Sequence, residues 1–539
     1  MDIKKITFIL ILLTQSIILP QKNNVPKLIV GIVVDQMRFD YTTRFYNNFG
    51  NDGLKRLLNE GTNFTFTHYN YVPTVTGPGH ATVYTGTSPF YHGIINNTWF
   101  DKTEKRQVYC TEDSTVHGAG TGGNEGKQSP KRLLTTTITD QLKIASSGKA
   151  KVISISIKDR GAILPGGQSA DAAYWYEHST GRFISSSYYM EHLPKWMDEF
   201  NHKKLPDIYL SQSWELSLPL TEYTVSTKDE TTYEEDVFAE GKVSFPHNFN
   251  KLDSISKYGK LITTPFGNQL LAELAKAVIK NENMGKNSFT DFLAVSFSSP
   301  DYIGHAYGPN SVEVQDMYIK FDKQIEEFLN YLDTEVGAGN YLLFLTADHG
   351  VAENTDFLKG LKIHAGSLNL QKFIDSLKSF LKGNYGDENI LEGIYGRQIF
   401  FNKAEIAKRN LKLAEIERAV KDYLYALPEV SQVFTRGELE KESASRTSAN
   451  LILNGFNFYR SGDIAFELQP DYLTSYSGKG TTHSTKYSYD THVPLIFFGW
   501  HIPKKTVNDP VYIVDIAPTI ANLLGIIEPN ACIGIPIIK

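Results

Sequence analysis

The chain has 539 residues, of which 41% are hydrophobic and 21% are charged, and its formal net charge at pH 7 is −6. This length can bury a large core and exceeds the usual size of a single domain. The composition is that of an ordinary globular protein. A negative balance without a basic stripe argues against a nucleic-acid partner, although local cations in a cleft could still bind a small anionic substrate.

The first residues have the pattern of an export signal. Lys4 and Lys5 precede an apolar run at residues 6–13, and a second short apolar patch ends before Pro20. A basic start followed by a short apolar stretch predicts a secretory signal peptide over residues 1–20, because the stretch is too short and too interrupted for a membrane span. No Ala-x-Ala cleavage site is visible, so an uncleaved N-terminal anchor is the alternative. We expect a periplasmic protein with no stable membrane span after signal removal.

Cysteine chemistry contributes little to this sequence. Only Cys110 and Cys532 are present, and neither has the spacing of a metal ligand. We expect both to be buried as small apolar residues. The sequence neither supports nor excludes a disulfide bridge between them.

Four short apolar runs predict buried, mostly parallel strands at residues 27–34, 151–157, 292–297 and 340–347. Polar residues follow three of these runs: Asp35 follows the first, Asp301 and His305 the third, and Asp348 and His349 the fourth. In open α/β sheets, ligands bind just beyond the carboxyl ends of such strands. Carboxylates and imidazoles placed there by three separate strands are what a hydrolytic metal centre needs.

Helices are predicted between these strands. Residues 52–61 have helical periodicity that ends at a glycine, and Thr76 begins a tight turn into a helix whose first turn contains Pro78. Residues 311–333 predict a long amphipathic helix, and residues 515–524 a last one after a further apolar run at 493–498. The predicted fold is therefore α/β, with a mostly parallel central sheet sandwiched by helices.

Two regions interrupt this pattern within a catalytic domain expected over residues 27–539. Residues from about 165 to 260 are aromatic and polar, and we expect an inserted cap rather than part of the sheet, with plain surface loops as the alternative. Between about 366 and 470, two amphipathic helices and short strands predict a second, α+β insertion.

Taken singly, the polar motifs are weak. Asp35 could be a helix cap, and Asp348 with His349 could form a turn before Gly350. The i, i+4 spacing of Asp301 and His305 can place two ligands on one face of a helix, but a surface aspartate beside a packed histidine has the same spacing. His483 could be an ordinary loop histidine. The interpretation as a metal centre rests on the occurrence of all these residues in one chain, each beyond a predicted strand or in a polar loop.

With these motifs the chain resembles the alkaline phosphatase superfamily, and within it the periplasmic phosphate-irrepressible alkaline phosphatases of the PafA type. The resemblance runs from about residue 27 to the C-terminus. The matching stretches are residues 33–41, 71–76, 92–97, 158–160, 301–305, 347–350 and 480–484. The resemblance implies an α/β sandwich core with two zinc ions. It assigns Asp301, His305 and His483 to one zinc, and Asp35, Asp348 and His349 to the other, with Thr76 as an oxygen ligand.

The chemistry of these residues agrees with that assignment. A mixed set of carboxylates and imidazoles suits zinc, and three protein ligands leave an open catalytic position. Two metals about 3.5–4 Å apart can clamp the attacking and leaving oxygens of an in-line displacement. Zinc can also activate a threonine hydroxyl, which is otherwise a poor nucleophile.

The choice of nucleophile rests on the resemblance, because Thr74 and Thr76 lie in the same segment. Thr76 matches the family position, and we expect Thr74 to support the loop. Four further polar residues near the motifs are expected either to be structural or to support the metal ligands without binding a metal themselves: His80, Asp322, Asp490 and His492.

The predicted function is a zinc-dependent alkaline phosphatase, which releases inorganic phosphate from small-molecule phosphate monoesters through a phosphothreonine on Thr76. By resemblance, Asn97, Lys158 and Arg160 bind the phosphoryl group. The related nucleotide pyrophosphatases and phosphodiesterases are the main alternative, although they lack a counterpart of Lys158 and Arg160. Sulfatases of the superfamily do not fit, because the Cys/Ser-x-Pro-x-Arg context is absent. A non-catalytic, zinc-stabilised binding protein is the second alternative, and a monomer is expected.

Overall fold

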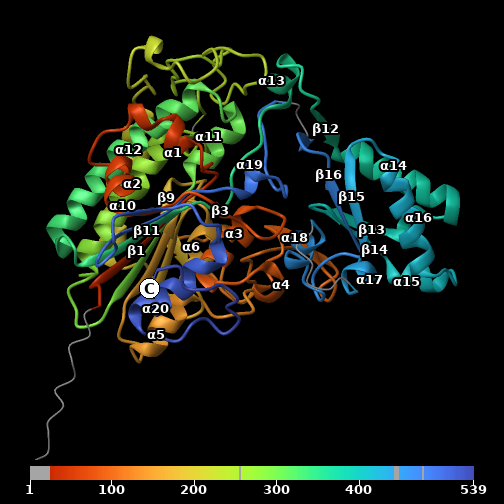
Figure 1. Ribbon diagram of the computed structural model, residues 1–539, viewed down its shortest axis with the longest axis horizontal. Coiled ribbons are helices and arrows are strands. Elements are labelled where there is room, and N and C mark those ends of the chain that lie inside the picture. Colours follow the sequence, from red (N-terminus) through yellow and green to blue (C-terminus); the bar gives the residue numbers. More distant parts are fainter. Residues whose placement is uncertain (1–24, 254–255, 442–447, 476–478, 539) are drawn as a thin grey trace, which may run out of the picture.

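The computed structural model describes residues 25–253, 256–441, 448–475 and 479–538 (Figure 1). The signal peptide predicted over residues 1–20 lies outside these residues. Within the described ranges, no helix is both long enough and apolar enough to cross a membrane.

A ten-stranded sheet forms the centre of the molecule, in the order β19-β2-β18-β11-β1-β10-β7-β8-β9-β6. Its four middle strands are fully buried: β11 (Tyr341–Thr346), β1 (Leu28–Val34), β10 (Asp291–Phe297) and β7 (Val152–Ser156). These strands are parallel, with β1 paired to both β10 and β11 and β10 paired to β7. The prediction of an α/β fold with a mostly parallel central sheet is confirmed.

Only some of the flanking strands run opposite to the middle ones. β18 (Leu495–Gly499) is antiparallel to both β11 and β2 (Thr62–Phe64), and β19 (Lys505–Val507) completes that edge. At the other edge lies β6 (Gly118–Ala119). Because the antiparallel strands lie outside the four middle strands, the carboxyl ends of these four strands all meet on one side of the sheet.

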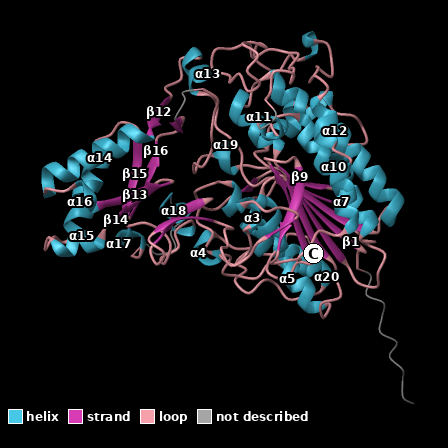
Figure 2. Cartoon of the chain, turned by 180° about the vertical axis from the view of Figure 1, so that it is seen from behind, coloured by secondary structure: helices cyan, strands magenta, loops and turns pink. Residues whose placement is uncertain are grey.

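Helices cover both faces of this sheet (Figures 1 and 2). One layer contains α2 (Leu54–Glu60), α10 (Pro265–Asn281) and α12 (Val312–Leu332). The other contains α3 (Thr76–Thr85), α5 (Ile138–Ala145), α6 (Asp159–Gly166) and α20 (Ile516–Leu524). Ser311 caps α12, since its hydroxyl accepts the backbone N–H of Val314, and Gly86 ends α3 in the left-handed conformation.

The prediction that residues 165–260 form a cap rather than part of the sheet is wrong for the first third of that region. β8 (Ala172–Glu177) pairs in parallel with β7, and β9 (Arg182–Ser186) pairs antiparallel with β8. All six residues of β8 are buried, so its aromatic side chains belong to the core. The polar and aromatic composition concealed this strand, because even Glu177 is buried, where it accepts the hydroxyls of Thr121 and Thr180.

The rest of this region consists of loops and short helices. Its helices are α7 (Lys195–His202), α8 (Leu205–Leu210) and α9 (Lys257–Leu261). Trp214, Phe238 and Phe249 from this region are buried in the main core. The region therefore packs tightly on the sheet and its helices.

Residues 366–470 form a separate body beside the central sheet (Figures 1 and 2). A four-stranded sheet has the order β13-β14-β16-β15, with β13 (Leu391–Tyr395), β14 (Gln398–Phe401), β16 (Ile464–Leu468) and β15 (Val430–Thr435). Helices α14 (Leu370–Tyr385) and α16 (Leu413–Tyr425) pack on it. Leu377 and Leu381 of α14 and Val420 of α16 belong to a hydrophobic core of this body alone.

The two cysteines are not paired. Cys110 is buried beside Ala81 and Trp99, and Cys532 is partly buried. Burial raises the pKa of the Cys110 thiol to about 12, so this residue behaves as a small apolar side chain.

Candidate metal centre

The six predicted metal ligands come together at the carboxyl ends of β1, β10 and β11. Asp35 directly follows β1, and Asp348 and His349 follow β11 after one residue. β10 leads into α11 (Ser299–Tyr307), which has Pro300 in its first turn and carries Asp301 and His305. The i, i+4 spacing brings Asp301 Oδ1 within 3.1 Å of His305 Nε2. His483 arrives from the loop between β17 (Tyr472–Ser475) and α19 (Ser488–Thr491).

We call Asp35, Asp348 and His349 the inner group, because the exposed fraction of each is 0%. His349 Nε2 lies 3.4 Å from Asp35 Oδ1 and 3.6 Å from Asp348 Oδ2. Three donor atoms of this group have no hydrogen-bond partner: Asp35 Oδ1, Asp348 Oδ2 and His349 Nε2. Buried polar atoms in native proteins are nearly always paired, so three unpaired lone-pair donors around one point fit a bound cation.

We call Asp301, His305 and His483 the outer group. Asp301 Oδ1 lies 3.6 Å from His483 Nε2, in addition to its contact with His305. The imidazoles of His483 and His349 stack with ring centroids 3.6 Å apart, so the two groups touch. Donor atoms of Asp301, His349 and His483 also lie within 4.8 Å of one another. His349 is therefore close to both groups, a position that the resemblance did not imply.

Each histidine of the centre is oriented by a backbone carbonyl. The Nδ1 atoms lie 2.8 Å from Thr481 O in His305, 2.9 Å from Gly350 O in His349 and 2.7 Å from Thr74 O in His483. A carbonyl only accepts, so Nδ1 carries the proton and the Nε2 lone pair is left for a metal. This donor set of imidazole nitrogens and carboxylate oxygens fits zinc.

Burial of the ionisable side chains and repulsion between like charges have the largest effects on the pKa values of the centre. Burial and then the charge of Asp348 raise the pKa of Asp35 well above its usual value. Burial acts in the same direction on Asp301, but His305 and Lys158 outweigh it and lower the pKa of that carboxyl. Burial, followed by His349, lowers the pKa of His483. The imidazole of His483 is therefore neutral, as a metal ligand requires.

Lys158 joins the two groups. It is the N-cap residue of α6 and is 4% exposed, so it is a buried cation and not part of a solvated turn. Its Nζ lies 2.7 Å from Asp35 Oδ2, 2.5 Å from Asp301 Oδ2 and 3.4 Å from Thr76 Oγ. The side chain of Tyr302 lies beneath it, with Nζ 5.0 Å from the ring centroid.

The other predicted substrate contacts lie around the start of α3. Thr76 is the first residue of this helix, and the backbone N–H of Gly77 donates to Asn97 Oδ1 at 2.7 Å. That bond fixes the amide of Asn97 so that its Nδ2 remains as the donor. Arg160 donates from Nη1 to the hydroxyl of Tyr109 at 2.8 Å, and that hydroxyl donates to Asp159 at 2.5 Å.

Sequence reasoning missed Gln36. Its side chain donates to Asp301 Oδ1 at 2.7 Å and its backbone N–H to Asp348 Oδ1 at 3.2 Å, so one residue contacts both groups. Gln36 has a φ of 65°, in the left-handed region that only a few residue types adopt readily. Its position directly after Asp35 at a strand end was the available signal.

Two of the residues expected to be structural, Thr74 and Asp322, bond to backbone groups of neighbouring segments. Thr74 donates to Thr485 O at 2.8 Å, and Asp322 accepts the backbone N–H groups of Gly50 and Leu54. His80 supports the centre, since its Nδ1 lies 2.9 Å from Thr76 O and 3.4 Å from Asp348 Oδ2.

The other two lie farther along the chain than His483, with Asp490 in α19 and His492 directly after it. Asp490 accepts the backbone N–H of Thr485 at 2.6 Å, and the ring of His492 stacks on that of His68 with centroids 4.5 Å apart. Both residues therefore hold the segment in place rather than contact the centre.

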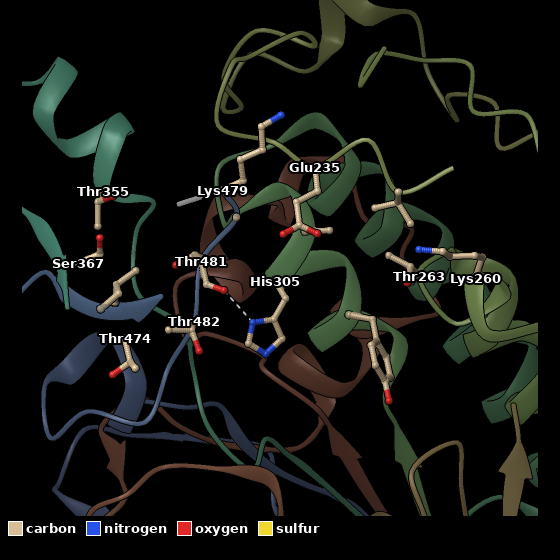
Figure 3. Close-up of a pocket in the computed structure, with 15 residues that line it drawn as sticks. Glu235, Lys260, Thr263, His305, Thr355, Ser367, Thr474, Lys479, Thr481 and Thr482 are labelled. Atoms are coloured by element: carbon tan, nitrogen blue, oxygen red, sulfur yellow. Dashed lines mark hydrogen bonds between the residues drawn. The ribbon is translucent and has the colours of Figure 1, made fainter. Parts of the chain in front are cut away.

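A pocket of about 410 Å³ opens onto the outer group (Figure 3). His305 lies in its middle, bonded to Thr481, with Glu235 and Lys479 above it and Lys260 to one side. The side chain of His305 is 34% exposed, whereas that of Asp301 is 5% exposed. Solvent therefore reaches the centre from the side of the outer group.

Comparisons with known proteins cover almost the whole chain. Residues 29–493 match the family model of type I phosphodiesterase / nucleotide pyrophosphatase. The chain is 41% identical over 531 residues to alkaline phosphatase PafA of Elizabethkingia meningoseptica, covering 98% of this chain and 97% of that protein. It is 43% identical over 520 residues to alkaline phosphatase PhoV of Synechococcus elongatus, with 96% and 94% covered. The crystal structure of wild-type PafA superposes with a TM-score of 0.92 at 41% identity, covering 95% of this chain and 98% of that one.

Proposed function

Since this chain belongs to the type I phosphodiesterase / nucleotide pyrophosphatase family and matches alkaline phosphatases over nearly its full length, we propose that it is an alkaline phosphatase that hydrolyses small-molecule phosphate monoesters. The main support for the proposal is the metal centre itself. Three buried donor atoms of its inner group have no hydrogen-bond partner, and Thr76 and Lys158 lie next to this group. The catalytic domain would span residues 27–539.

Two zinc ions are proposed as the cofactors. The inner group, with the hydroxyl of Thr76, would hold one. The outer group, in which His305 and His483 both contact Asp301, would hold the other. When bound, zinc supplies Lewis-acid stabilisation of charge on phosphoryl and ester oxygens and lowers the pKa of a coordinated hydroxyl. Metal ions are needed because enzymes accelerate monoester hydrolysis by up to about 10²¹-fold, whereas an acid–base pair supplies only about 10²–10⁴-fold of that acceleration.

Thr76 is the proposed nucleophile. Its Oγ forms a bond to phosphorus as the ester bond breaks, and water then releases inorganic phosphate from the phosphothreonine. The residue begins α3, where the helix dipole places partial positive charge, and the ammonium of Lys158 lies 3.4 Å from Oγ. Both features favour a negatively charged phosphoryl group beside this hydroxyl.

Asn97, Lys158 and Arg160 are the proposed ligands of the phosphoryl oxygens away from the metals. Asn97 has Nδ2 available because its Oδ1 accepts from Gly77. Arg160 is held by Tyr109, which limits the freedom of its guanidinium. A monoester dianion has more charged oxygen than a diester, so two cations in this place favour the monoester.

The second candidate function is hydrolysis of phosphodiesters or nucleotide pyrophosphates, for which the matching family model is named. A non-catalytic binding protein has less support, since no predicted ligand or nucleophile is missing from the chain.

The deciding experiment compares initial rates for an aryl phosphate monoester and the matching diester on one preparation whose zinc content is measured. We expect the monoester to have the larger kcat/KM, and a preference for the diester would establish the second candidate instead.

Export to the periplasm and a monomeric state complete the proposal. Cell fractionation and the mass of the secreted form test them, and a cytoplasmic form that retains residues 1–20 would contradict export.

A further inference from the structure

The side chain of Arg397 connects the α+β body of residues 366–470 to the outer group of the metal centre. Arg397 lies in the turn between β13 and β14. Its guanidinium donates from Nη1 to Glu467 Oε2 at 2.7 Å and from Nη2 to Ser484 Oγ at 2.5 Å. Ser484 directly follows His483 in the sequence. The α+β body therefore bonds to the neighbour of a predicted zinc ligand.

Arg397 is itself held at a fixed place. Gly396, with a φ of 62°, forms the turn before it, and the backbone carbonyl of Arg397 accepts the N–H of Phe466 in β16 at 3.0 Å. The side chain of Arg397 is 10% exposed, and that of its ion-pair partner Glu467 is 6% exposed. A planar guanidinium bound at two nitrogens keeps little freedom. A movement of Ser484 would leave one of its buried donors without a partner, which is unfavourable.

The backbone of Ser484 has an unfavourable conformation. Its φ is 96°, in the region that glycine adopts readily and other residues rarely adopt. Both neighbours of Ser484 bond to Thr74, since Nδ1 of His483 lies 2.7 Å from Thr74 O and Thr485 O accepts the hydroxyl of Thr74 at 2.8 Å. With Nδ1 held in this way, Nε2 of His483 faces Asp301 Oδ1 at 3.6 Å. The turn at Ser484 thus sets the direction of a predicted zinc ligand.

A backbone conformation of this kind persists only where the surrounding structure holds it. The bond from Arg397 to Ser484 is a contact that does so. The next residues of the loop are attached to the α+β body independently, because Lys486 donates to Gln432 and the hydroxyl of Tyr487 donates to Leu468 O at 2.9 Å. Loss of the bond at Ser484 would therefore release the turn without detaching the loop.

We propose that Arg397 is a positioning residue of the metal centre. It holds the unfavourable turn at Ser484 and thereby keeps His483 directed at the outer zinc. The inference rests on the two-zinc centre of the proposed function. It gives the α+β body a role in that centre, because this body supplies the fixed end of the bond.

The first test measures bound zinc per chain over a series of buffered free zinc concentrations, with full-length protein. Ser484→Ala removes the bond from Arg397 but keeps a Cβ and with it the backbone strain. It should weaken the binding of one of the two zinc ions by about 10–100-fold, the loss that is typical when a residue supporting a metal ligand is replaced. Ser488→Ala is the matched control at an exposed serine, and it should bind both ions as the wild type does.

Ser484→Gly separates positioning from a merely structural bond. This variant loses the same bond, but glycine adopts the positive φ without strain, so the turn remains and His483 stays in place. Its zinc affinity should therefore stay close to that of the wild type. Zinc affinity as low in Ser484→Gly as in Ser484→Ala would overturn the proposal.

Arg397→Met tests the other end of the bond. In the wild-type background it should weaken zinc binding as much as Ser484→Ala does. In the Ser484→Gly background it should change zinc binding little, because the unpaired Glu467 is common to both backgrounds and the strain is present only in the first. Equal losses in the two backgrounds would overturn the proposal. If Arg397→Met fails to fold, its combination with Glu467→Gln replaces it, since no buried charge is then left unpaired.

These measurements distinguish failure of the inference from failure of the proposed function. A wild-type protein that binds only one zinc ion would overturn the two-zinc centre and the inference with it. Two zinc ions bound with equal affinity by the wild type and by Ser484→Ala would overturn the inference alone.

Discussion

The inner and outer groups of the metal centre use the same kinds of donor in different surroundings. The inner group is completely buried, and three of its donor atoms have no partner. In the outer group, Asp301 is bonded by Gln36, Lys158 and His305, and His305 opens into the pocket. The core therefore fixes one half of the centre, and the other half faces whatever enters the pocket. In the proposed mechanism, Thr76 would therefore attack from the inner side, and the leaving group would depart through the outer side.

The largest expected effect follows from replacing the proposed nucleophile on the inner side. Thr76→Ala should lower monoester kcat by at least about 10³-fold, because the covalent step is lost while the small side chain contributes little packing. Steady-state kinetics and a Tm measurement check both parts. Thr74→Ala is the matched control, and loss of turnover there with turnover kept in Thr76→Ala would reassign the nucleophile.

The next effect concerns the two cations beside the centre. Charge-assisted hydrogen bonds contribute about 1.5–3 kcal/mol each, so Lys158→Ala combined with Arg160→Ala should lower monoester kcat/KM by about 10²–10⁴-fold. Diester hydrolysis should fall much less, because a diester has one charged oxygen fewer. Equal losses for both substrates would mean that the two residues have a structural role.

A third prediction distinguishes the inner and outer sides by the leaving group. His305→Asn should slow an alkyl phosphate more than an aryl phosphate, by about tenfold, because a poor leaving group depends more on stabilisation of the departing oxygen. Asp348→Asn should slow both substrates to a similar degree. If the two variants show the same dependence on the leaving group, the assignment of sides is wrong.

The smallest expected effect is that of Gln36, which orients Asp301. Gln36→Ala should weaken the binding of one of the two zinc ions by about 10–100-fold, which is typical of residues that bond to metal ligands. Competition with a fluorescent zinc chelator measures this affinity. Met37→Leu is a volume-conserving control in the same segment, and an equal loss there would contradict the specific role of Gln36.

Much of the centre could be predicted because the strands that carry it are strongly apolar. The runs ending at Asp35 and Asp348 and the run before Asp301 correspond to β1, β11 and β10, whose carboxyl ends meet by necessity in a parallel sheet. His483 is different, because its loop follows β17, a strand that lies outside the central sheet. Its place in the centre was predicted from the resemblance alone.

Other features depend on packing that sequence patterns do not reveal. β8 has neither a polar alternation nor an aliphatic run, so Tyr174, Trp175 and Tyr176 suggested a cap rather than a core strand. The ion pairs of Lys158 and the role of Gln36 arise only when β1, β7 and β10 are adjacent. Unpartnered atoms such as Asp35 Oδ1 cannot be detected without knowing which side chains are buried.

The most direct test of the account is a zinc titration of metal-free protein, with monoester hydrolysis and bound zinc measured at each step. Two groups with open ligand positions predict that activity rises until about two zinc ions are bound per chain. Full activity at one zinc per chain or fewer would contradict the two-metal centre.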